Sequence, residues 1–213
     1  MNIGILGSGD VGQTLGLGLA AAGHEVVLGT RDPAGDKAQA WAARAGGRGR
    51  AGTFAEAAAF GEVVVLATLW SGTENALRLA GAENLAGKVV MDATNPLDFS
   101  QGAPRLALGH TDSGGEQVQR WVPSARVVKA FNTVGSPHMV NPDFPGGPPD
   151  MLIAGDHDAA KATVSRLAGD LGWPTVDLGG IDGARFLEPL AMAWVVYGFR
   201  TGTWNHAFKL LRG

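Results

Sequence analysis

Short runs of hydrophobic residues alternate along the chain with longer segments in which hydrophobic residues recur at helical spacing. The runs Asn2–Leu6 and Glu25–Gly29 have the length and composition of buried strands. Between them, Val11–Ala22 places Leu15 and Leu19 on one face of a helix. A strand, a helix and a strand at this spacing predict a right-handed crossover in a parallel sheet.

The same alternation continues to the end of the chain and predicts an α/β fold. Further strands are expected at Arg50–Thr53, Val63–Thr68, Lys88–Asp92, Ala125–Phe131, Met151–Ala154 and Thr175–Leu178. Further helices are expected at Asp36–Ala45, Phe54–Phe60, Thr73–Ala80, before Trp121, around Ala160–Leu171, and at Phe186–Phe199 and Trp204–Leu211. Four prolines make Asn141–Pro149 an irregular loop.

This order of elements predicts a Rossmann-like, doubly wound, mainly parallel sheet with helices on both faces and closing C-terminal helices. We expect a single domain over residues 1–213. Within it, residues 1–112 would form the dinucleotide-binding half, and residues 113–213 a smaller half for the acceptor and for dimer contacts.

Composition removes several classes of function. The chain has no cysteine, which excludes disulfides, thiolate metal sites and cysteine nucleophiles. Lys and Arg number 17 against 20 Asp and Glu, without a basic run, so a nucleic-acid partner is not expected. The longest charge-free stretches are shorter than the roughly 20 residues of a membrane span, so a membrane partner is not expected and the cytoplasm is the expected location.

The most informative motif is Gly7-Ser8-Gly9-Asp10-Val11-Gly12, which follows the first strand and opens the first helix. In this context Gly7 permits a tight turn, Gly9 lets the backbone approach a pyrophosphate, and Gly12 allows close helix–strand packing. Asp10 stands where it could cap the helix. A glycine-rich turn without a ligand is the alternative, but strand, spacing and helix all favour dinucleotide binding.

The residues after the second strand indicate which dinucleotide binds. Thr30 offers a hydroxyl, Arg31 a planar cation suited to a 2′-phosphate, and Lys37 further positive charge. Asp32, shifted by one or two positions, could instead accept a hydrogen bond from a ribose 2′-OH. The pattern favours NADP over NAD, although Arg31 could also be a solvated surface residue.

Three later segments end predicted strands on the edge where a nicotinamide should lie. They are Thr68-Leu69-Trp70, Asp92-Ala93-Thr94-Asn95-Pro96 and Lys129-Ala130-Phe131-Asn132-Thr133. Each segment alone could be an ordinary turn. Their common location at the carboxyl ends of strands favours ligand contacts.

Acid–base residues are scarce. The one tyrosine, Tyr197, is not part of a Tyr-x-x-x-Lys pair, and the five histidines show no metal-binding spacing, so neither a catalytic residue nor a metal is assigned. Only His110 and His138 are expected near the cleft, and each is more often structural than catalytic. Hydride transfer between two planar heterocycles depends mainly on positioning, because the cofactors carry the electronics.

The glycine-rich turn, together with Gly29-Thr30-Arg31-Asp32, Asp92-Ala93-Thr94-Asn95-Pro96 and Val128-Lys129-Ala130-Phe131-Asn132-Thr133, resembles the NADPH-dependent reductases of the deazaflavin coenzyme F420. The same pattern is similar to the reductase domain of six-transmembrane metalloreductases. The resemblance extends to the closing helix with Arg185 and Glu188-Pro189.

This resemblance implies NADPH at the first turn, 2′-phosphate contacts from Thr30 and Arg31, and a deazaflavin or related flavin as the second substrate in the cleft near Asn95 and Asn132. It also implies a homodimer through the C-terminal helices. The expected cofactor contacts are Gly7, Ser8, Gly9, Asp10, Val11, Gly12, Thr30, Arg31, Lys37, Thr68, Leu69, Trp70, Asn95, Pro96, Ala130 and Asn132. The expected acceptor contacts are Asn132, Pro137 and His138.

Two other functions remain open at this point. One is the reduction of a small carbonyl or imine, which needs a proton donor such as His138 or Lys129. The other is a non-catalytic module that senses NADPH and regulates a partner. The nucleotide motifs alone do not separate these functions from hydride exchange with a deazaflavin or flavin.

Overall fold

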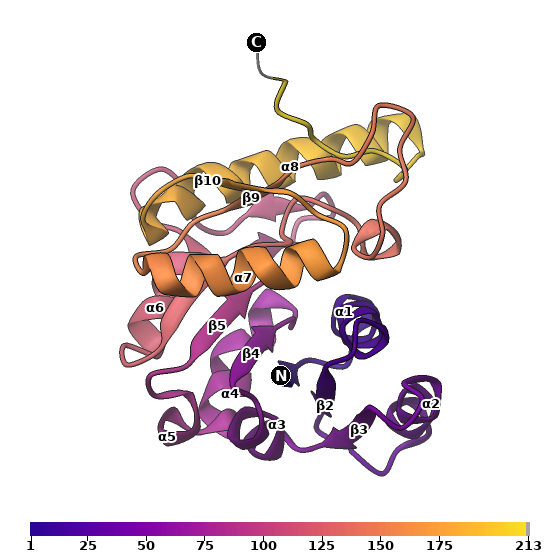
Figure 1. The fold of residues 1–213 in the computed structure, drawn as a ribbon. Coiled ribbons are helices and arrows are strands. Elements are labelled where there is room, and N and C mark those ends of the chain that lie inside the picture. The colour runs from indigo at the N-terminus through magenta and orange to yellow at the C-terminus, as the bar shows by residue number, and fades with distance from the viewer. Residues whose placement is uncertain (212–213) are drawn as a thin grey trace.

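A parallel sheet of six strands forms the centre of the computed structural model, which describes residues 1–211 (Figure 1). Its strand order is β3-β2-β1-β4-β5-β8, so the direction of winding reverses between β1 and β4. The predicted parallel sheet is confirmed. The strands are β1 (Asn2–Leu6), β2 (Glu25–Gly29), β3 (Gly49–Gly52), β4 (Val63–Leu66), β5 (Val89–Asp92) and β8 (Arg126–Lys129).

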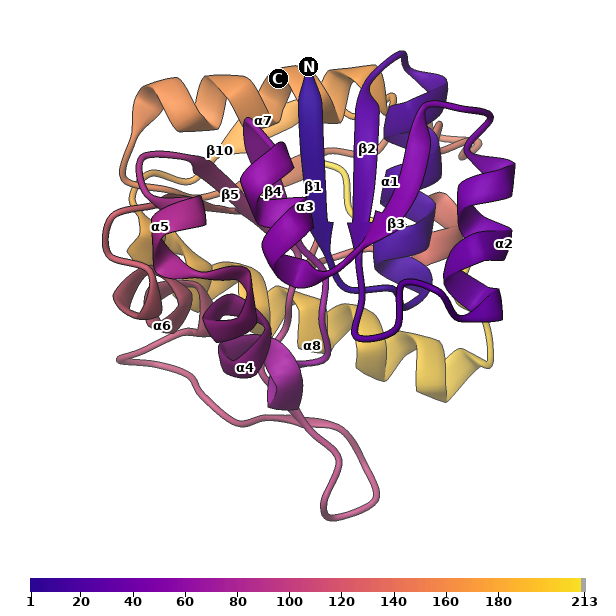
Figure 2. The same ribbon diagram turned by 90° about the horizontal axis from the view of Figure 1, so that it is seen from below.

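Two small strand pairs lie outside this sheet, and one of them is joined to it. Strands β9 (Met151–Ile153) and β10 (Thr175–Asp177) pair in parallel, and an antiparallel bridge between Lys129 and Ala154 joins them to β8. Strands β6 (Leu97–Asp98) and β7 (Arg105–Leu106) form a short antiparallel hairpin after Pro96. In Figure 2 the loop between them projects away from the body of the molecule.

Helices cover both faces of the sheet, as a doubly wound fold requires. One core cluster joins the sheet to Leu15 of α1, Trp41 of α2 and Val164 of α7, and the other joins it to Leu77 of α4 and Val118 of α6. The helix bounds are α1 (Asp10–Ala21), α2 (Asp36–Arg44), α3 (Phe54–Phe60), α4 (Trp70–Ala80), α5 (Ala82–Leu85), α6 (Gly114–Trp121), α7 (Asp158–Asp170) and α8 (Ala184–Thr201), with short 3₁₀ turns η1 (Ser136–His138) and η2 (Ile181–Gly183). Within residues 1–211, none of the helices combines the length and apolar character needed to cross a membrane.

The C-terminal end differs from the prediction. One long helix, α8, closes the fold. The prediction of a second helix at Trp204–Leu211 is wrong, because these residues have no regular structure. Gly202 follows α8 in the left-handed conformation, with φ 68°, and turns the chain away from the helix axis.

Residues 203–211, here called the C-terminal strap, then run without regular structure along α8 and the loop 141–150. Trp194 donates its indole N–H to the carbonyl of His206, and the N–H of Asp150 bonds to the carbonyl of Phe208. These contacts with distant segments replace the hydrogen bonds that a helix would have made internally.

Candidate functional site

The glycine-rich turn after β1 is built by three glycines with different structural constraints. Gly7 has φ 128°, and a Cβ there would lie 2.2 Å from the carbonyl oxygen of Ala67. A Cβ on Gly12 would lie 2.0 Å from the carbonyl oxygen of Gly7. A Cβ on Gly9, by contrast, would meet none of the described atoms within 4 Å. Gly7 and Gly12 are therefore required by packing, whereas Gly9 faces open space.

The first helix begins without a side-chain cap. Gly9 is its N-cap, and Asp10 is its first helical residue, so the expectation that Asp10 caps α1 is wrong. Gly9 and Asp10 are exposed, while Val11 packs partly against the core. The first N–H groups of α1 thus face open space without a capping side chain from residues 1–211. Such a helix start favours a bound anion through its free donors and the helix dipole.

The end of β2 lies beside this turn. The Ser8 hydroxyl donates to the Thr30 hydroxyl at 3.1 Å, and the backbone N–H of Asp32 donates to the same oxygen at 3.4 Å. The carboxylate of Asp32 lies against Gly35, where a Cβ would be 2.5 Å from Oδ2. Arg31 and Lys37 are exposed. The end of β2 therefore presents the Thr30 hydroxyl and the Arg31 cation, and Lys37 follows in the first turn of α2.

The loop after β4 presents one side chain to solvent and turns the next one inward. Leu69 is 80% exposed. Trp70 instead stacks on Trp121 of α6, with 5.3 Å between ring centroids, and Thr68 shares a 2.9 Å hydrogen bond with Thr73. Leu69 is thus available at the carboxyl edge, whereas the Trp70 ring belongs mainly to the packing of α4 against α6.

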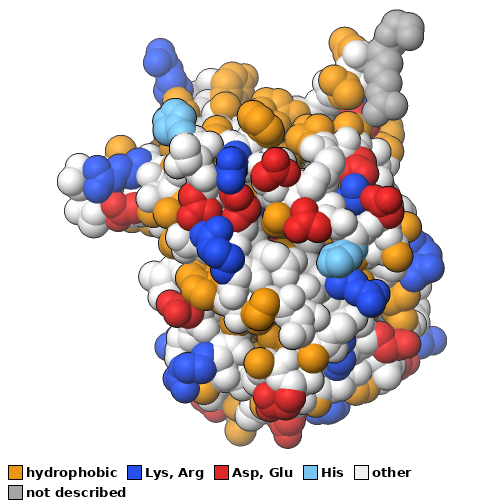
Figure 3. All heavy atoms as spheres, turned by 90° about the vertical axis from the view of Figure 1, so that its left-hand side faces the viewer, with side chains coloured by type: hydrophobic (Ala, Val, Ile, Leu, Met, Phe, Trp, Pro, Cys, Tyr) orange, Lys and Arg blue, Asp and Glu red, His pale blue; other side chains and the backbone are white. Residues whose placement is uncertain are grey.

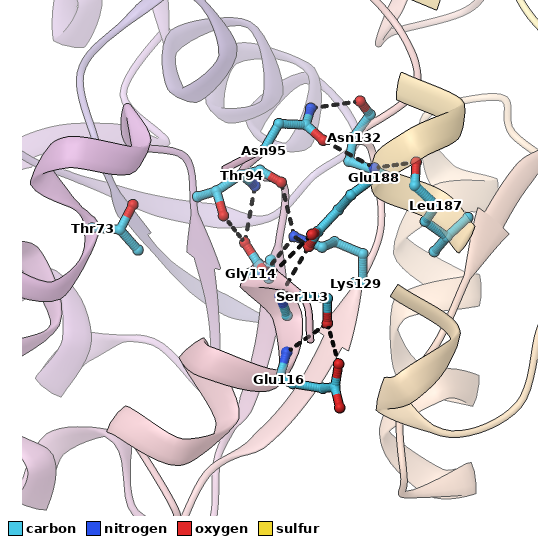
Figure 4. A network of polar contacts seen from close by, with 12 residues as sticks. Thr73, Thr94, Asn95, Ser113, Gly114, Glu116, Lys129, Asn132, Leu187 and Glu188 are labelled. Carbon is cyan, nitrogen blue, oxygen red and sulfur yellow. Dashed lines mark hydrogen bonds and ion pairs between the residues drawn. The ribbon is translucent and has the colours of Figure 1, made fainter. Parts of the chain in front are cut away.

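The loops after β5 and β8 meet through a pair of asparagines (Figure 4). Asn95 donates from Nδ2 to the carbonyl of Asn132 at 2.7 Å. Asn132 donates from its own Nδ2 to Asn95 Oδ1 at 3.1 Å and to the carbonyl of Leu187 at 3.0 Å. The structure therefore brings these two predicted site residues together.

The residues flanking this pair are held by the fold. Pro96 accepts a hydrogen bond from Ala107 of the projecting hairpin. Ala130 is fully buried in the core, so only its backbone could meet a ligand. Phe131 adopts the left-handed conformation, with φ 58°, and thereby turns the chain into the segment that holds Asn132.

A buried charge network, which we define as Asp92, Lys129 and Glu188, lies next to these loops. Figure 4 labels Lys129 and Glu188. The Lys129 ammonium is 0% exposed and donates to Asp92 Oδ2 at 2.8 Å, to the Thr94 carbonyl at 2.8 Å and to Glu188 Oε1 at 2.9 Å. An ammonium has three N–H donors, and all three are used.

The network keeps Lys129 protonated. Burial alone would lower the pKa of Lys129, but the neighbouring charges of Asp92 and Glu188 outweigh burial and raise this pKa above its ordinary value. A raised pKa and complete burial make this ammonium a poor proton donor to a substrate. Its role is to hold the ends of β5 and β8 against α8.

Glu188 is the member of the network that the sequence did not identify as part of the site. Its Oε2 accepts from the N–H of Gly114 at 2.9 Å, and its Oε1 from the N–H of Gly115 at 2.9 Å, so it caps the start of α6. The sequence offered two signals for this network. One is a glutamate on a mainly apolar helix, and the other is an aspartate and a lysine that each end an apolar strand. Asp92, Lys129 and Glu188 are 37 to 96 positions apart in the sequence, so only the folded chain brings them together.

The predicted acceptor residues Pro137 and His138 lie on η1, which packs against α1. Pro137 is exposed. The His138 ring lies 5.0 Å from the ring of Phe144, within the proline-rich loop 141–149. The proline-rich loop therefore contacts His138 of η1, one of the residues predicted to contact the acceptor.

One open hollow lies away from this edge. It has a volume of about 520 Å³ and is lined by Leu17, Ala20 and Ala21 of α1, by Arg44 at the end of α2, and by the segment after α2 that includes Arg48. These residues lie at the amino edge of the sheet, opposite Gly9 and Asn95. We therefore take the site from the geometry of the carboxyl edge rather than from this open hollow.

Comparisons with known proteins agree with the dinucleotide-binding geometry. A family model described as "NADP oxidoreductase coenzyme F420-dependent" matches residues 2–96. The F420-dependent NADP reductase of Methanothermobacter marburgensis is 34% identical over 203 residues, which cover 89% of each chain. A candidate F420-dependent NADP-reductase from Arthrobacter sp. FB24, known from a crystal structure, is 43% identical with a TM-score of 0.93 and 100% of both chains covered.

Similarity also extends to a longer protein. The metalloreductase STEAP3 of Rattus norvegicus is 31% identical over 203 residues, which cover 89% of this chain. The matched region is 36% of the length of that relative.

Proposed function

Because this chain belongs to the family of coenzyme F420-dependent NADP oxidoreductases, we propose that it transfers a hydride between NADP(H) and the deazaflavin coenzyme F420 or a related flavin. Membership makes the chain an NADP oxidoreductase, and the choice of acceptor is the proposal. The observation that carries it is the state of Lys129, whose three N–H donors are all used inside the protein. Lys129, one of the two proton donors considered for a carbonyl or imine, is thus unsuited to that role.

The residues of the first turn fit a dinucleotide. The open space in front of Gly9 and the uncapped start of α1 suit a pyrophosphate, which would accept hydrogen bonds from the backbone N–H groups of Asp10, Val11 and Gly12. When bound, NADPH supplies the hydride from its nicotinamide ring. The protein's part is to place this ring and to exclude water from it.

The end of β2 would select NADP through the 2′-phosphate. Thr30 offers a hydroxyl already oriented by Ser8, and the exposed Arg31 and Lys37 offer positive charge. The alternative partner, Asp32, lies against Gly35. The arrangement supports a phosphate here more than a bare 2′-hydroxyl.

The nicotinamide and the acceptor would meet at the carboxyl ends of β4, β5 and β8. Leu69 would contribute an apolar contact, and the Asn95–Asn132 pair would hold the two loops at a fixed separation. Pro137 and His138 would border the acceptor from the side of η1. A hydride carries two electrons, so the acceptor ring also takes one proton, for which solvent is the source.

Stopped-flow mixing tests the choice of acceptor. Protein loaded with NADPH is mixed with coenzyme F420, with free FMN, or with a small carbonyl compound, and NADPH oxidation is followed by its absorbance. Fast oxidation by F420 or a flavin supports the proposal. Oxidation by the carbonyl compound alone would show that the acceptor assignment is wrong, and tight NADPH binding without turnover would indicate a sensor.

We also propose that two copies pair through α8. Phe186 is 72% exposed, and Val196 and Tyr197 are exposed about three turns further along the same helix. At 3.6 residues per turn, Tyr197 lies almost in line with Phe186, and Val196 lies about 80° from it, so the three side chains share one side of α8. Hydrophobic side chains also gather along the top of the view in Figure 3, at the level where Figure 1 places α8. An apolar stripe of this kind is typical of a protein–protein contact.

A further inference from the structure

The buried charge network carries an excess of negative charge. Asp92, Lys129 and Glu188 are each no more than 1% exposed and contribute two negative charges and one positive charge. Lys129 therefore neutralises one carboxylate and leaves the other formally uncompensated. An uncompensated buried charge acts strongly on its surroundings, because solvent screens it weakly.

Hydrogen-bond donors surround both carboxyl groups. Asp92 accepts from the Thr94 N–H at 2.9 Å, from the Thr94 hydroxyl at 2.7 Å and from Lys129. Glu188 accepts from the N–H groups of Gly114 and Gly115 and from Lys129. Among residues 1–211, each of these partners serves as a donor, and a carboxylate offers only acceptors.

The surrounding charges do not cancel the excess. Glu116 pairs with Arg185 at 2.8 Å, and Asp112 pairs with Arg120 at 2.7 Å, so these four charges sum to zero. The start of α6, which donates to Glu188, supplies about half a positive charge at most. A net negative charge of roughly one half to one therefore remains in the network.

This charge lies directly beneath the proposed nicotinamide site. Lys129 donates to the Thr94 carbonyl and the Thr94 N–H donates to Asp92, so the network holds both backbone groups of the residue before Asn95. Asn95 is one residue further along the chain, about 3.8 Å between Cα atoms. A ring that contacts Asn95 would lie on the order of 10 Å from the network.

We propose that the buried charge network favours the oxidised cofactor and so makes bound NADPH a stronger hydride donor. The inference rests on the proposed NADP(H) site. The nicotinamide ring is neutral in NADPH and carries a positive charge in NADP⁺, so a nearby negative charge stabilises NADP⁺ selectively. At an effective dielectric constant near 20, one charge at this distance changes the ratio of the two affinities by roughly tenfold. For a two-electron couple, tenfold corresponds to about 30 mV.

Glu188→Gln tests the proposal, because glutamine keeps the shape of the side chain and removes the excess charge. The dissociation constants of NADPH and NADP⁺ are measured by isothermal titration calorimetry for wild type and variant. We expect the ratio of the NADP⁺ constant to the NADPH constant to rise roughly tenfold in the variant. The matched control is Glu62→Gln, which makes the same charge change at the exposed amino edge of β4 and should leave the ratio unchanged.

The outcomes separate this inference from the function on which it rests. If both constants change by the same factor in Glu188→Gln, the network only positions the loops and the inference is overturned. If wild-type protein binds neither NADPH nor NADP⁺, the proposed function is wrong, and the inference that rests on it is overturned as well. Should Glu188→Gln not fold, Asp92→Asn removes the same charge from β5 and must shift the ratio in the same direction.

Discussion

Replacing Gly9 with alanine should separate ligand binding from folding. Gly9 has φ −76° and ψ −178°, an extended backbone that alanine adopts freely, and an added Cβ would meet none of the described atoms within 4 Å. We expect the free energy of unfolding of Gly9→Ala to be unchanged or about 0.5 kcal/mol higher, because alanine reduces the entropy of the unfolded chain. The methyl group would instead occupy the space in front of the α1 N–H groups.

The expected cost to NADPH binding follows from those groups. A hydrogen bond to a charged partner contributes about 1.5–3 kcal/mol, so moving the pyrophosphate away from one or two backbone donors should weaken binding by about 3 kcal/mol, or roughly a hundredfold. Urea denaturation of the free protein gives the stability. Fluorescence titration with NADPH gives the affinity.

Gly12→Ala is the matched comparison, because its Cβ would lie 2.0 Å from the backbone oxygen of Gly7. Backbone cannot move aside as a flexible side chain can, so this variant should lose about 1–3 kcal/mol of stability, or more. If Gly9→Ala binds NADPH as tightly as wild type, the pyrophosphate does not lie against Gly9. If Gly9→Ala unfolds as readily as Gly12→Ala, the interpretation of the open space is wrong.

The remaining predictions concern the nucleotide end, the network and the helix α8. Arg31→Ala should weaken NADPH binding by about 1.5–3 kcal/mol and leave NADH nearly unchanged, and equal losses in titrations of both nucleotides would contradict the 2′-phosphate assignment. Lys129→Met leaves two buried carboxylates without their cation and should cost about 3–5 kcal/mol in urea denaturation, so a loss below about 1 kcal/mol would contradict the role given to this ion pair. Because the folded-state pKa of Lys129 is raised above 10.5, its contribution to stability should be complete below that pH and decline only as the pH rises through the raised pKa. Denaturation curves of the wild type at increasingly alkaline pH should therefore show a loss of unfolding free energy, and those of Lys129→Met should not show this loss. Phe186→Glu together with Val196→Glu should convert a dimer to a monomer in size-exclusion chromatography with light scattering, and an unchanged mass would place the dimer contact elsewhere.

Much of the fold could be predicted because buried parallel strands have a strong local signal. The β-branched and aliphatic runs at Asn2–Leu6 and Val63–Thr68 identify strands. The first strand has the predicted bounds, and the second ends at Leu66 instead of Thr68. Residue 67 already belongs to the turn that packs against Gly7, and this contact is not visible in the run itself.

The C-terminal strap and Glu188 could not be predicted in the same way. The segment Trp204–Leu211 has helix-like composition, but its backbone bonds to α8 and to Asp150, and these partners are distant in sequence. In the sequence, Glu188 is a polar residue on a mainly apolar helix. In the structure it contacts Lys129 and the start of α6. Its role depends on three elements meeting, which no local pattern encodes.

Transfer of an isotopic label tests the central claim most directly. Wild-type protein is incubated with NADPH that carries deuterium at the transferable position of the nicotinamide, together with oxidised coenzyme F420, and the reduced acceptor is examined by mass spectrometry. We predict that the deuterium appears in the reduced F420, because the hydride passes directly between the two rings. Reduced F420 that lacks the label, or no reduction of either F420 or free FMN while NADPH remains bound, would contradict the account.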